Sequence, residues 1–229
     1  MNAGLDIPPF LQRVKIVYSY TNLNLYDSIC PHQFQRRFIT KDIPFTETPA
    51  LKHGIQVHTA MEQRIAGGKP LPDAYRHWEP LAEPLARRKA KAEMQLAVDR
   101  QGKPVDFWGK GKDVPFIRGK ADAVVLNGSR AYIADFKTGK KREDPFELEV
   151  QAMLLKAQFP QLGTIIATYI WLKDSDVGQP HDVSNTGATF AKCSRIAQDI
   201  EQDRVYEKRS GPLCKWCDVV DCEYNRKET

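Results

Sequence analysis

Three charged side chains between Gly119 and Lys137 are the strongest candidates for chemistry in this sequence. Asp122 precedes a turn, and Asp135 and Lys137 follow it two residues apart. Two carboxylates can hold a divalent cation through oxygen ligands, and an ammonium beside them can hold a bound water or a phosphate. Such a cation can activate water and offset the charge that develops on a phosphodiester. The stretch is compatible with metal-dependent hydrolysis, but by itself an Asp-x-Lys pattern is more often a surface hairpin with scattered charges.

The register of a hairpin decides whether the two carboxylates meet. The apolar runs 121–126 and 131–136 flank Asn127-Gly128-Ser129, a pattern typical of two strands joined by a tight turn. A two-residue turn at Gly128-Ser129 places Asp122 opposite Asp135, and a turn at Asn127-Gly128 keeps them on one face. A three-residue turn without a bulge would separate them, because a one-residue slip flips every side chain. We predict that they share a face.

Four of the five cysteines lie near the two ends of the chain. Cys214, Cys217 and Cys222 form a C-x₂-C-x₄-C pattern, and Cys30 precedes a proline at a predicted helix break. Three close thiolates can bind Zn²⁺ or part of an iron–sulfur cluster, and either needs a fourth ligand. The tail contains no histidine, and Cys30 is well placed to supply that ligand. The fifth, Cys193, is in an amphipathic helix and is typical of a buried thiol.

Start and stop signals divide the chain into helices and strands. The predicted helices run over 19–29, 31–39, 49–66, 145–159 and 188–209. Each begins at or shortly after a capping residue or a proline, respectively Ser19, Pro31, Thr48, Asp144 and Ser184–Thr186. Strands are predicted at 91–99, around 105–108, in the hairpin and at 164–172, with a strand-like VKIVYSY at 14–20. The proline-rich residues 69–86 predict a loop with short helical turns. This order predicts an α/β fold with a mixed central sheet flanked by helices.

Bulk properties place the chain among globular proteins of a reducing compartment. The 229 residues carry a formal net charge of +5, which suits a polyanionic partner. No apolar run approaches the ~18 residues of a membrane span. The N-terminus lacks the pattern of a signal peptide. We therefore expect a cytoplasmic protein, in which cysteines are metal ligands or free thiols more often than disulfides.

The hairpin motifs resemble those of a known family. Gly119-Lys120-Ala121-Asp122, followed by Asp135-Phe136-Lys137-Thr138-Gly139, is similar to the core of the PD-(D/E)xK nucleases in their RecB-like branch. Lys120 departs from the pattern, since an apolar residue is usual there. The resemblance implies a restriction-endonuclease-like core.

The same resemblance extends to residues outside the hairpin. Gly54-Ile-Gln-Val-His58 matches a helical motif whose histidine is a metal ligand, and Glu93 loosely matches a strand glutamate. Gln151 matches the glutamine of a Gln-x-x-x-Tyr helix, but Leu155 replaces the tyrosine. By themselves, a helical histidine is more often structural and a strand glutamate is as often solvated.

The resemblance implies a role for each matched residue. His58, Asp122, Asp135 and the Phe136 carbonyl would hold Mg²⁺ or Mn²⁺. Lys137 would orient or help deprotonate the attacking water and stabilise the phosphate. Two further residues, Glu93 and Gln151, would support the site.

Iron–sulfur members of the branch, including AddB and the nucleases of CRISPR adaptation, have one cysteine before the nuclease motifs and three after them. Ser28-Ile29-Cys30-Pro31 resembles the upstream element. The resemblance implies a [4Fe–4S] cluster on Cys30, Cys214, Cys217 and Cys222 that clips the N-terminal helix to the tail, with Zn²⁺ as the alternative. Four residues separate Cys217 from Cys222, where five are commoner.

We therefore expect one RecB-like nuclease domain over residues 1–229, with a helical part at 19–49, a core at 50–180 and a helix with the cysteine tail at 185–229. The implied activity is an exonuclease on single-stranded DNA ends, with a helicase, recombination or CRISPR-type protein as a possible partner. Two alternatives remain: an inactive DNA-binding or adaptor protein of the same fold, and a zinc-stapled interaction module. Basic residues are candidates for a phosphate-tracking groove: Arg36, Arg37, Arg87, Arg88, Lys89, Lys137, Lys140, Lys141 and Arg142.

Overall fold

The computed structural model describes residues 16–43 and 46–226. The chain divides into two compact units, Met1–Pro44 with Ser194–Thr229, and Phe45–Cys193. The expected division of one domain into 19–49, 50–180 and 185–229 stays a prediction. No helix among the described residues is long and apolar enough to cross a membrane.

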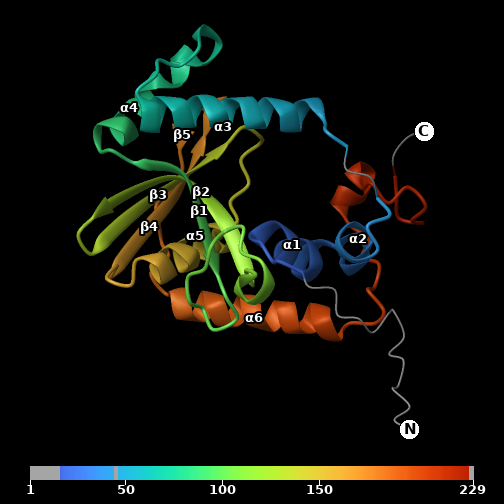
Figure 1. Cartoon of the computed structure of the whole chain (residues 1–229). Coiled ribbons are helices and arrows are strands. Elements are labelled where there is room, and N and C mark those ends of the chain that lie inside the picture. The colour runs from blue at the N-terminus through green and yellow to red at the C-terminus, as the bar shows by residue number, and fades with distance from the viewer. Residues whose placement is uncertain (1–15, 44–45, 227–229) are drawn as a thin grey trace. The chain divides into compact units, whose positions relative to one another are not determined.

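A mixed six-stranded sheet forms the centre of the unit Phe45–Cys193 (Figure 1). Antiparallel pairs join β1 to β2 and β2 to β3, whereas β3 and β4 are parallel. The sheet order is β1-β2-β3-β4-β5, and β6 also pairs with β4. The bounds are β1 (Lys91–Val98), β2 (Ile117–Asn127), β3 (Arg130–Lys137), β4 (Thr164–Trp171), β5 (Asp176–Val177) and β6 (His181–Asp182). The predicted mixed sheet with flanking helices is confirmed.

The turn of the β2–β3 hairpin is the two-residue Gly128-Ser129 turn. Asn127 pairs with Arg130 and Ala123 with Ala134. Gly128 has φ 57°, a left-handed conformation that a glycine adopts without steric cost. Continuing this register by one residue brings Asp122 opposite Asp135.

Helices begin where their capping residues predict. In α3 (Pro49–Gly67), the Thr48 side chain accepts a hydrogen bond from the Leu51 amide at 3.2 Å, and left-handed Gly68 ends the helix. In α5 (Pro145–Gln158), the Asp144 side chain accepts from the Phe146 amide at 3.1 Å. These caps set the start of the two helices that contact the site.

The two faces of the sheet are covered by different helices. Val57, Met61 and Ile65 of α3 are buried together with Ala134 and Phe136 of β3. α4 (Glu79–Arg87) joins the same cluster, and α5 lies on the other side of the sheet (Figure 1). The single-turn helices of this unit are η4 (Asp73–Trp78), η5 (Gly111–Asp113) and η6 (Leu172–Asp174).

The other unit is built from short helices and the C-terminal tail. Its elements are α1 (Tyr20–Asn24), η2 (Leu25–Ile29), α2 (Pro31–Phe34), η3 (Gln35–Ile39), the end of α6 (Thr186–Gln202) and η7 (Pro212–Trp216). Ser19 caps α1 as predicted. η2 and η3 are π-helical, and Cys30 lies between η2 and α2. The Tyr26 ring packs edge-on against Phe34 and Tyr206 in this unit.

The last long helix is shorter than predicted. It ends at Gln202 and not at Arg209. Asp203 explains the end, because its side chain accepts hydrogen bonds from the amides of Val205 and Tyr206 at 2.8 and 2.9 Å. Tyr206 has φ 51°, which a right-handed helix does not allow.

Three other predictions also need correction. No strand forms around residues 105–108: Val98 and Pro104 make an isolated bridge, and the Asp106 side chain then turns the chain by accepting from the Trp108 amide. The described part of VKIVYSY forms no named strand. The proline-rich segment 69–86 contains a short helical turn, η4, as predicted, but it continues into a nine-residue helix, α4, which tolerates its internal Pro84 while burying Ala82 and Leu85.

Candidate metal site

Three potential metal ligands meet between α3 and the sheet. The Nδ1 atom of His58 lies 3.3 Å from Oδ1 of Asp122 and 3.6 Å from Oε1 of Glu93. One ligand atom from each of these residues can be chosen so that all three lie within 4.8 Å of one another. Imidazole nitrogen and carboxylate oxygens form a donor set suited to a divalent metal ion.

His58 is positioned by the packing of α3 on the end of β3. Val57 and Met61, which flank it on the helix, are fully buried. The His58 ring lies edge-on to the Phe136 ring, with centroids 6.3 Å apart. Gly54 faces the residue that follows β3, since a Cβ there would be in ordinary contact with Oγ1 of Thr138 at 3.7 Å. The hydrophobic face of α3 therefore holds His58 over the strands.

A local distortion of the strands turns the two carboxylates toward His58. Glu93 has φ 48°, in the left-handed region that costs a non-glycine residue about 1 kcal/mol or more. Side chains four residues apart on a regular strand lie on the same face of the sheet. Here Ala123 belongs to the core beneath α3, whereas a Cβ on Gly119 would lie 3.1 Å from Leu154 of α5. The alternation is therefore interrupted around Asp122, which lies opposite the strained Glu93 where the β1–β2 pairing skips a position between Ala92–Ala123 and Met94–Ala121.

Asp122 links the ligand set to β3. Its Oδ2 atom accepts a hydrogen bond from the Phe136 amide at 2.7 Å, while Oδ1 faces His58. The peptide that follows Asp135 is thereby fixed against Asp122. The role of the Phe136 carbonyl as a metal ligand stays a prediction.

Asp135 and Lys137 form a second, more buried group with α5. Oδ1 of Asp135 accepts from Nε2 of Gln151 at 2.6 Å, and the Lys137 ammonium lies 2.7 Å from Oδ2. Lys137 also lies 2.9 Å from Oε2 of Glu147. Asp135 is only 3% exposed, so both of its oxygens depend on these partners.

Burial and neighbouring charges shift the pKa values of this group. Burial, with the Asp122 charge as the next contribution, raises the pKa of Asp135 despite the opposing Lys137. For Lys137, burial lowers the pKa, but the charges of Asp135 and Glu147 outweigh it and hold the pKa above its ordinary value. Lys137 is therefore an ammonium at neutral pH.

The pKa of His58 is raised to about 10. Burial alone would lower it, but the hydrogen bonds and charges of Asp122 and Glu93 outweigh the burial. The metal-free site therefore carries an imidazolium at neutral pH, and a metal ion must displace its proton. We therefore expect metal affinity to increase as the pH rises toward 10, because the imidazolium proton that a metal ion would displace is lost over this range.

The residues present fit a divalent cation. Asp122 and Asp135 repel each other, as the raised pKa of Asp135 indicates, and a cation between them would relieve that repulsion. Oδ2 of Asp135 is buried and accepts no well-aligned hydrogen bond, although Lys137 is near. Oxygen-rich sites of this kind suit Mg²⁺ or Mn²⁺.

The structure places the sequence candidates in two neighbouring sets. His58, Glu93 and Asp122 form the close ligand set. Asp135 and Lys137 of β3 and Gln151 of α5 form the second set, with a charge interaction between Asp135 and Asp122. Glu93, expected in a supporting role, thus lies among the potential ligands, and Asp135 lies beside them.

Sequence reasoning missed two contributors. Glu147 is in the first turn of α5, four residues before Gln151 and so on the same helical face; that spacing was a usable signal. Lys120, noted as a departure from the motif, places its ammonium 3.2 Å from Glu93. Both provide a charge partner for a site residue.

The cysteine tail in the other unit is tied to the N-terminal helices. The Arg209 amide donates to the Cys30 sulfur at 3.5 Å, and the Gly211 amide donates to the Cys214 sulfur at 3.3 Å. Burial raises the pKa of Cys217, and the charges of Cys30 and Cys214 raise it further. These thiols are therefore near enough to interact, an arrangement that a bound metal would stabilise.

Several predicted phosphate contacts are engaged within the protein. Arg36 pairs with Asp42 at 2.7 Å and with Asp221 at 3.0 Å, and Arg37 pairs with Asp218. Lys141 lies 2.6 Å from Asp176. These ion pairs reduce the charge that the residues present to a ligand.

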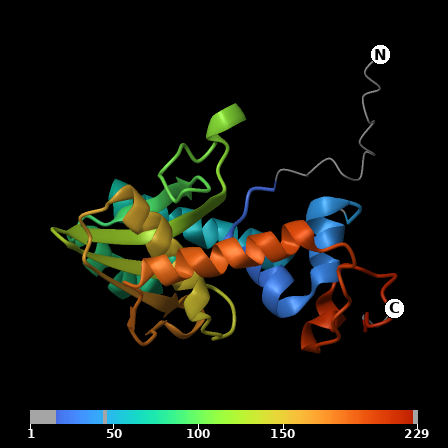
Figure 2. The ribbon, with the colours of Figure 1, turned by 90° about the horizontal axis from the view of Figure 1, so that it is seen from below.

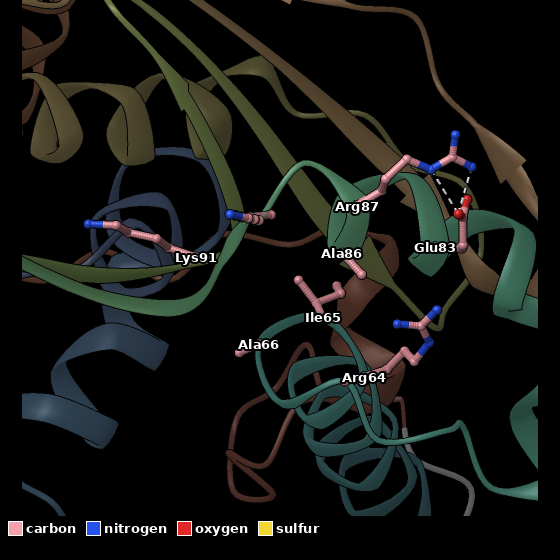
Figure 3. A pocket seen from close by; sticks show the side chains of 10 residues that line it. Arg64, Ile65, Ala66, Glu83, Ala86, Arg87 and Lys91 are labelled. Atoms are coloured by element: carbon pink, nitrogen blue, oxygen red, sulfur yellow. Dashed lines mark hydrogen bonds and ion pairs between the residues drawn. The ribbon is translucent and has the colours of Figure 1, made fainter.

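A hollow of about 660 Å³ lies where α3 and α4 end and β1 begins (Figure 3). Two of its cations are paired: Arg64 with Glu79 and Arg87 with Glu83. None of the predicted catalytic or metal residues lines it. The lining residues are Arg64, Ile65, Ala66, Gly68, Glu83, Ala86, Arg87, Lys89, Ala90 and Lys91.

A mixed sheet that carries a histidine–carboxylate set and an Asp-x-Lys strand defines a restriction-endonuclease-like protein. The family model of the PD-(D/E)XK nuclease superfamily matches residues 17–222, and the chain belongs to this superfamily of metal-dependent nucleases. The crystal structure of SSO0001 is similar with a TM-score of 0.58 at 17% identity, over 93% of this chain and 88% of that one, which shows the fold alone. A search of curated proteins finds no significant match.

Proposed function

We propose that this protein is a Mg²⁺- or Mn²⁺-dependent deoxyribonuclease that removes nucleotides from single-stranded DNA ends. The observation that carries the proposal is a histidine–carboxylate ligand set with a half-buried lysine beside it. A structural hairpin would not need two carboxylates, a histidine and a lysine at one place, because burying them is costly.

Each residue of the site has a separate role in the proposed hydrolysis. His58, Glu93 and Asp122, with Asp135 beside them, would hold the metal ion, which would supply an activated water and offset charge on the phosphate. Lys137 orients the attacking water and stabilises the developing negative charge. Its raised pKa favours these roles over that of proton acceptor at neutral pH. Gln151 and Glu147 hold Asp135 and Lys137 in place.

The test is digestion of single and double strands labelled at the 5′ or the 3′ end. We expect release of labelled nucleotides from single strands in Mg²⁺ or Mn²⁺, and no release in EDTA. Degradation that continues in EDTA, or no degradation of any strand, would contradict the proposal. The second outcome would favour a DNA-binding or adaptor protein, although the presence of both carboxylates and the lysine supports an enzyme.

We also propose a [4Fe–4S] cluster on Cys30, Cys214, Cys217 and Cys222. Hydrogen bonds from backbone amides to two of the sulfurs support a bound cluster, since such bonds tune its potential. Zn²⁺ on the same four thiolates is the alternative.

Protein purified without oxygen should therefore contain about four irons per chain. Cys217→Ser should lose the iron and the visible absorbance. Cys193→Ala is the matched control, because this fully buried thiol lies in α6 and should leave the iron content unchanged. A colourless parent that contains zinc would contradict the cluster and leave the nuclease proposal standing.

A further inference from the structure

An exposed tryptophan lies in the connection between β1 and β2. Trp108 is 61% exposed. The connection extends away from the sheet (Figure 2). A single exposed apolar residue is ordinary, but this indole is part of a built structure.

Hydrogen bonds and a tight turn fix the backbone around Trp108. The Asp106 side chain accepts from the Trp108 amide at 2.8 Å, and the Asp106 carbonyl accepts from the Gly109 amide at 3.0 Å. Only glycine fits at position 109, because a Cβ there would lie 2.1 Å from the Asp113 carbonyl oxygen. The turn thus presents the indole in a defined place.

Arg118 of β2 supports the indole from the sheet. Its guanidinium lies 4.8 Å from the Trp108 ring centre and 4.9 Å from that of Phe107. The same group donates to the Phe107 carbonyl at 3.2 Å. The Phe107 and Trp108 rings meet edge to face at 4.9 Å and 81°. Two aromatic rings and a cation therefore form one unit, which we call the Trp108 platform (Phe107, Trp108 and Arg118).

The charge around the platform suits a nucleic acid strand. Residues 99–118 contain five cations and three carboxylates, a net charge of +2. Two of the carboxylates, Asp99 and Asp106, accept hydrogen bonds from backbone amides within the loop. Exposed aromatic rings among cations are the features on which unpaired bases stack.

The platform and the proposed metal site share a strand. Arg118 and Asp122 are four residues apart on β2, which is about 13 Å along a strand. That separation spans about four stacked nucleotides at ~3.4 Å each. A base on Trp108 would therefore be a few nucleotides from a phosphate at the metal ion.

We propose that the Trp108 platform stacks an unpaired base of a single-stranded nucleic acid and so gives the proposed nuclease its preference for single strands. The link between stacking and cleavage rests on the proposed nuclease function, but the stacking of a base on Trp108 does not require hydrolysis. A duplex keeps its bases stacked inside the helix and offers none to the indole. The competing hypothesis is that the Trp108 platform binds another protein.

Binding in EDTA separates stacking from cleavage. Single strands carrying 2-aminopurine at successive positions should show quenching at one or two of them with the parent protein. Trp108→Ala should bind the single strand about tenfold more weakly, the lower part of the range for loss of one base stack. It should lose the position-specific quenching and leave duplex binding unchanged.

Two matched variants sharpen the test. Trp108→Phe keeps an aromatic face and should bind like the parent, whereas Trp108→Leu keeps only apolar surface and should bind like Trp108→Ala. Parent-like binding by Trp108→Ala or Trp108→Leu would overturn the stacking proposal and favour a protein surface. An equal loss for duplex would also overturn it. A parent that binds and quenches but never hydrolyses would defeat the nuclease proposal alone.

Discussion

Lys137→Ala should reduce the rate of DNA hydrolysis by at least about a hundredfold. The half-buried ammonium lies 2.7 Å from the buried carboxylate of Asp135, and a fixed charge partly shielded from water stabilises a transition state more strongly than one in bulk water. Loss of one such group typically costs ~10²–10³ in rate. The measurement is a single-turnover rate on a labelled single strand in saturating Mg²⁺.

Lys141→Ala is the matched control for this prediction. It removes a lysine four residues further along the chain, whose ammonium pairs with Asp176 at the protein surface. We expect a rate close to that of the parent. Lys137→Ala also leaves Asp135 and Glu147 without their shared cation, so thermal stability must be measured alongside. A folded Lys137→Ala protein that cuts as fast as the parent would remove Lys137 from the mechanism.

Asp122→Asn should abolish metal-dependent activity while preserving the fold. Asparagine keeps an oxygen that can accept the Phe136 amide, so the link between β2 and β3 can survive. It removes the negative charge that faces His58. Loss of a residue that only orients a metal ligand lowers metal affinity about 10–100-fold. Loss of a ligand itself should therefore lower the metal affinity by more than about a hundredfold.

Metal affinity is measured by the stabilisation that Mn²⁺ confers on thermal unfolding. A bound ion raises stability according to its concentration relative to Kd. The parent should be stabilised, and Asp122→Asn should not. Asp182→Asn, which changes an exposed aspartate on β6, is the control and should respond like the parent. Equal stabilisation of parent and Asp122→Asn would place the metal elsewhere.

Local patterns predicted most of the elements because their causes lie within a few residues. Thr48-Pro49 and Gly68 determine the ends of α3, and Asp144 determines the start of α5. Asn127-Gly128-Ser129 determines the hairpin register, since a left-handed glycine completes the two-residue turn. Errors arose where a side chain outside the periodic pattern intervened, as Asp203 does at the end of α6.

The sequence by itself determined which residue types were available for chemistry and which of them lay on one strand or one helix. Asp135 and Lys137 share a face because a strand alternates, and Gln151 follows Glu147 by one helical turn. The resemblance carried by these motifs agreed with the superfamily found for residues 17–222.

Only the tertiary structure decided how the sets combine. Glu93 joins His58 and Asp122 because its left-handed backbone interrupts the alternation of β1 and β2, a distortion that no local pattern reports. Glu147 became a partner of Lys137 because α5 packs against β3. Such contacts join residues far apart in the chain, so their geometry depends on the packing of whole elements, whereas caps and turns depend on neighbours in the sequence.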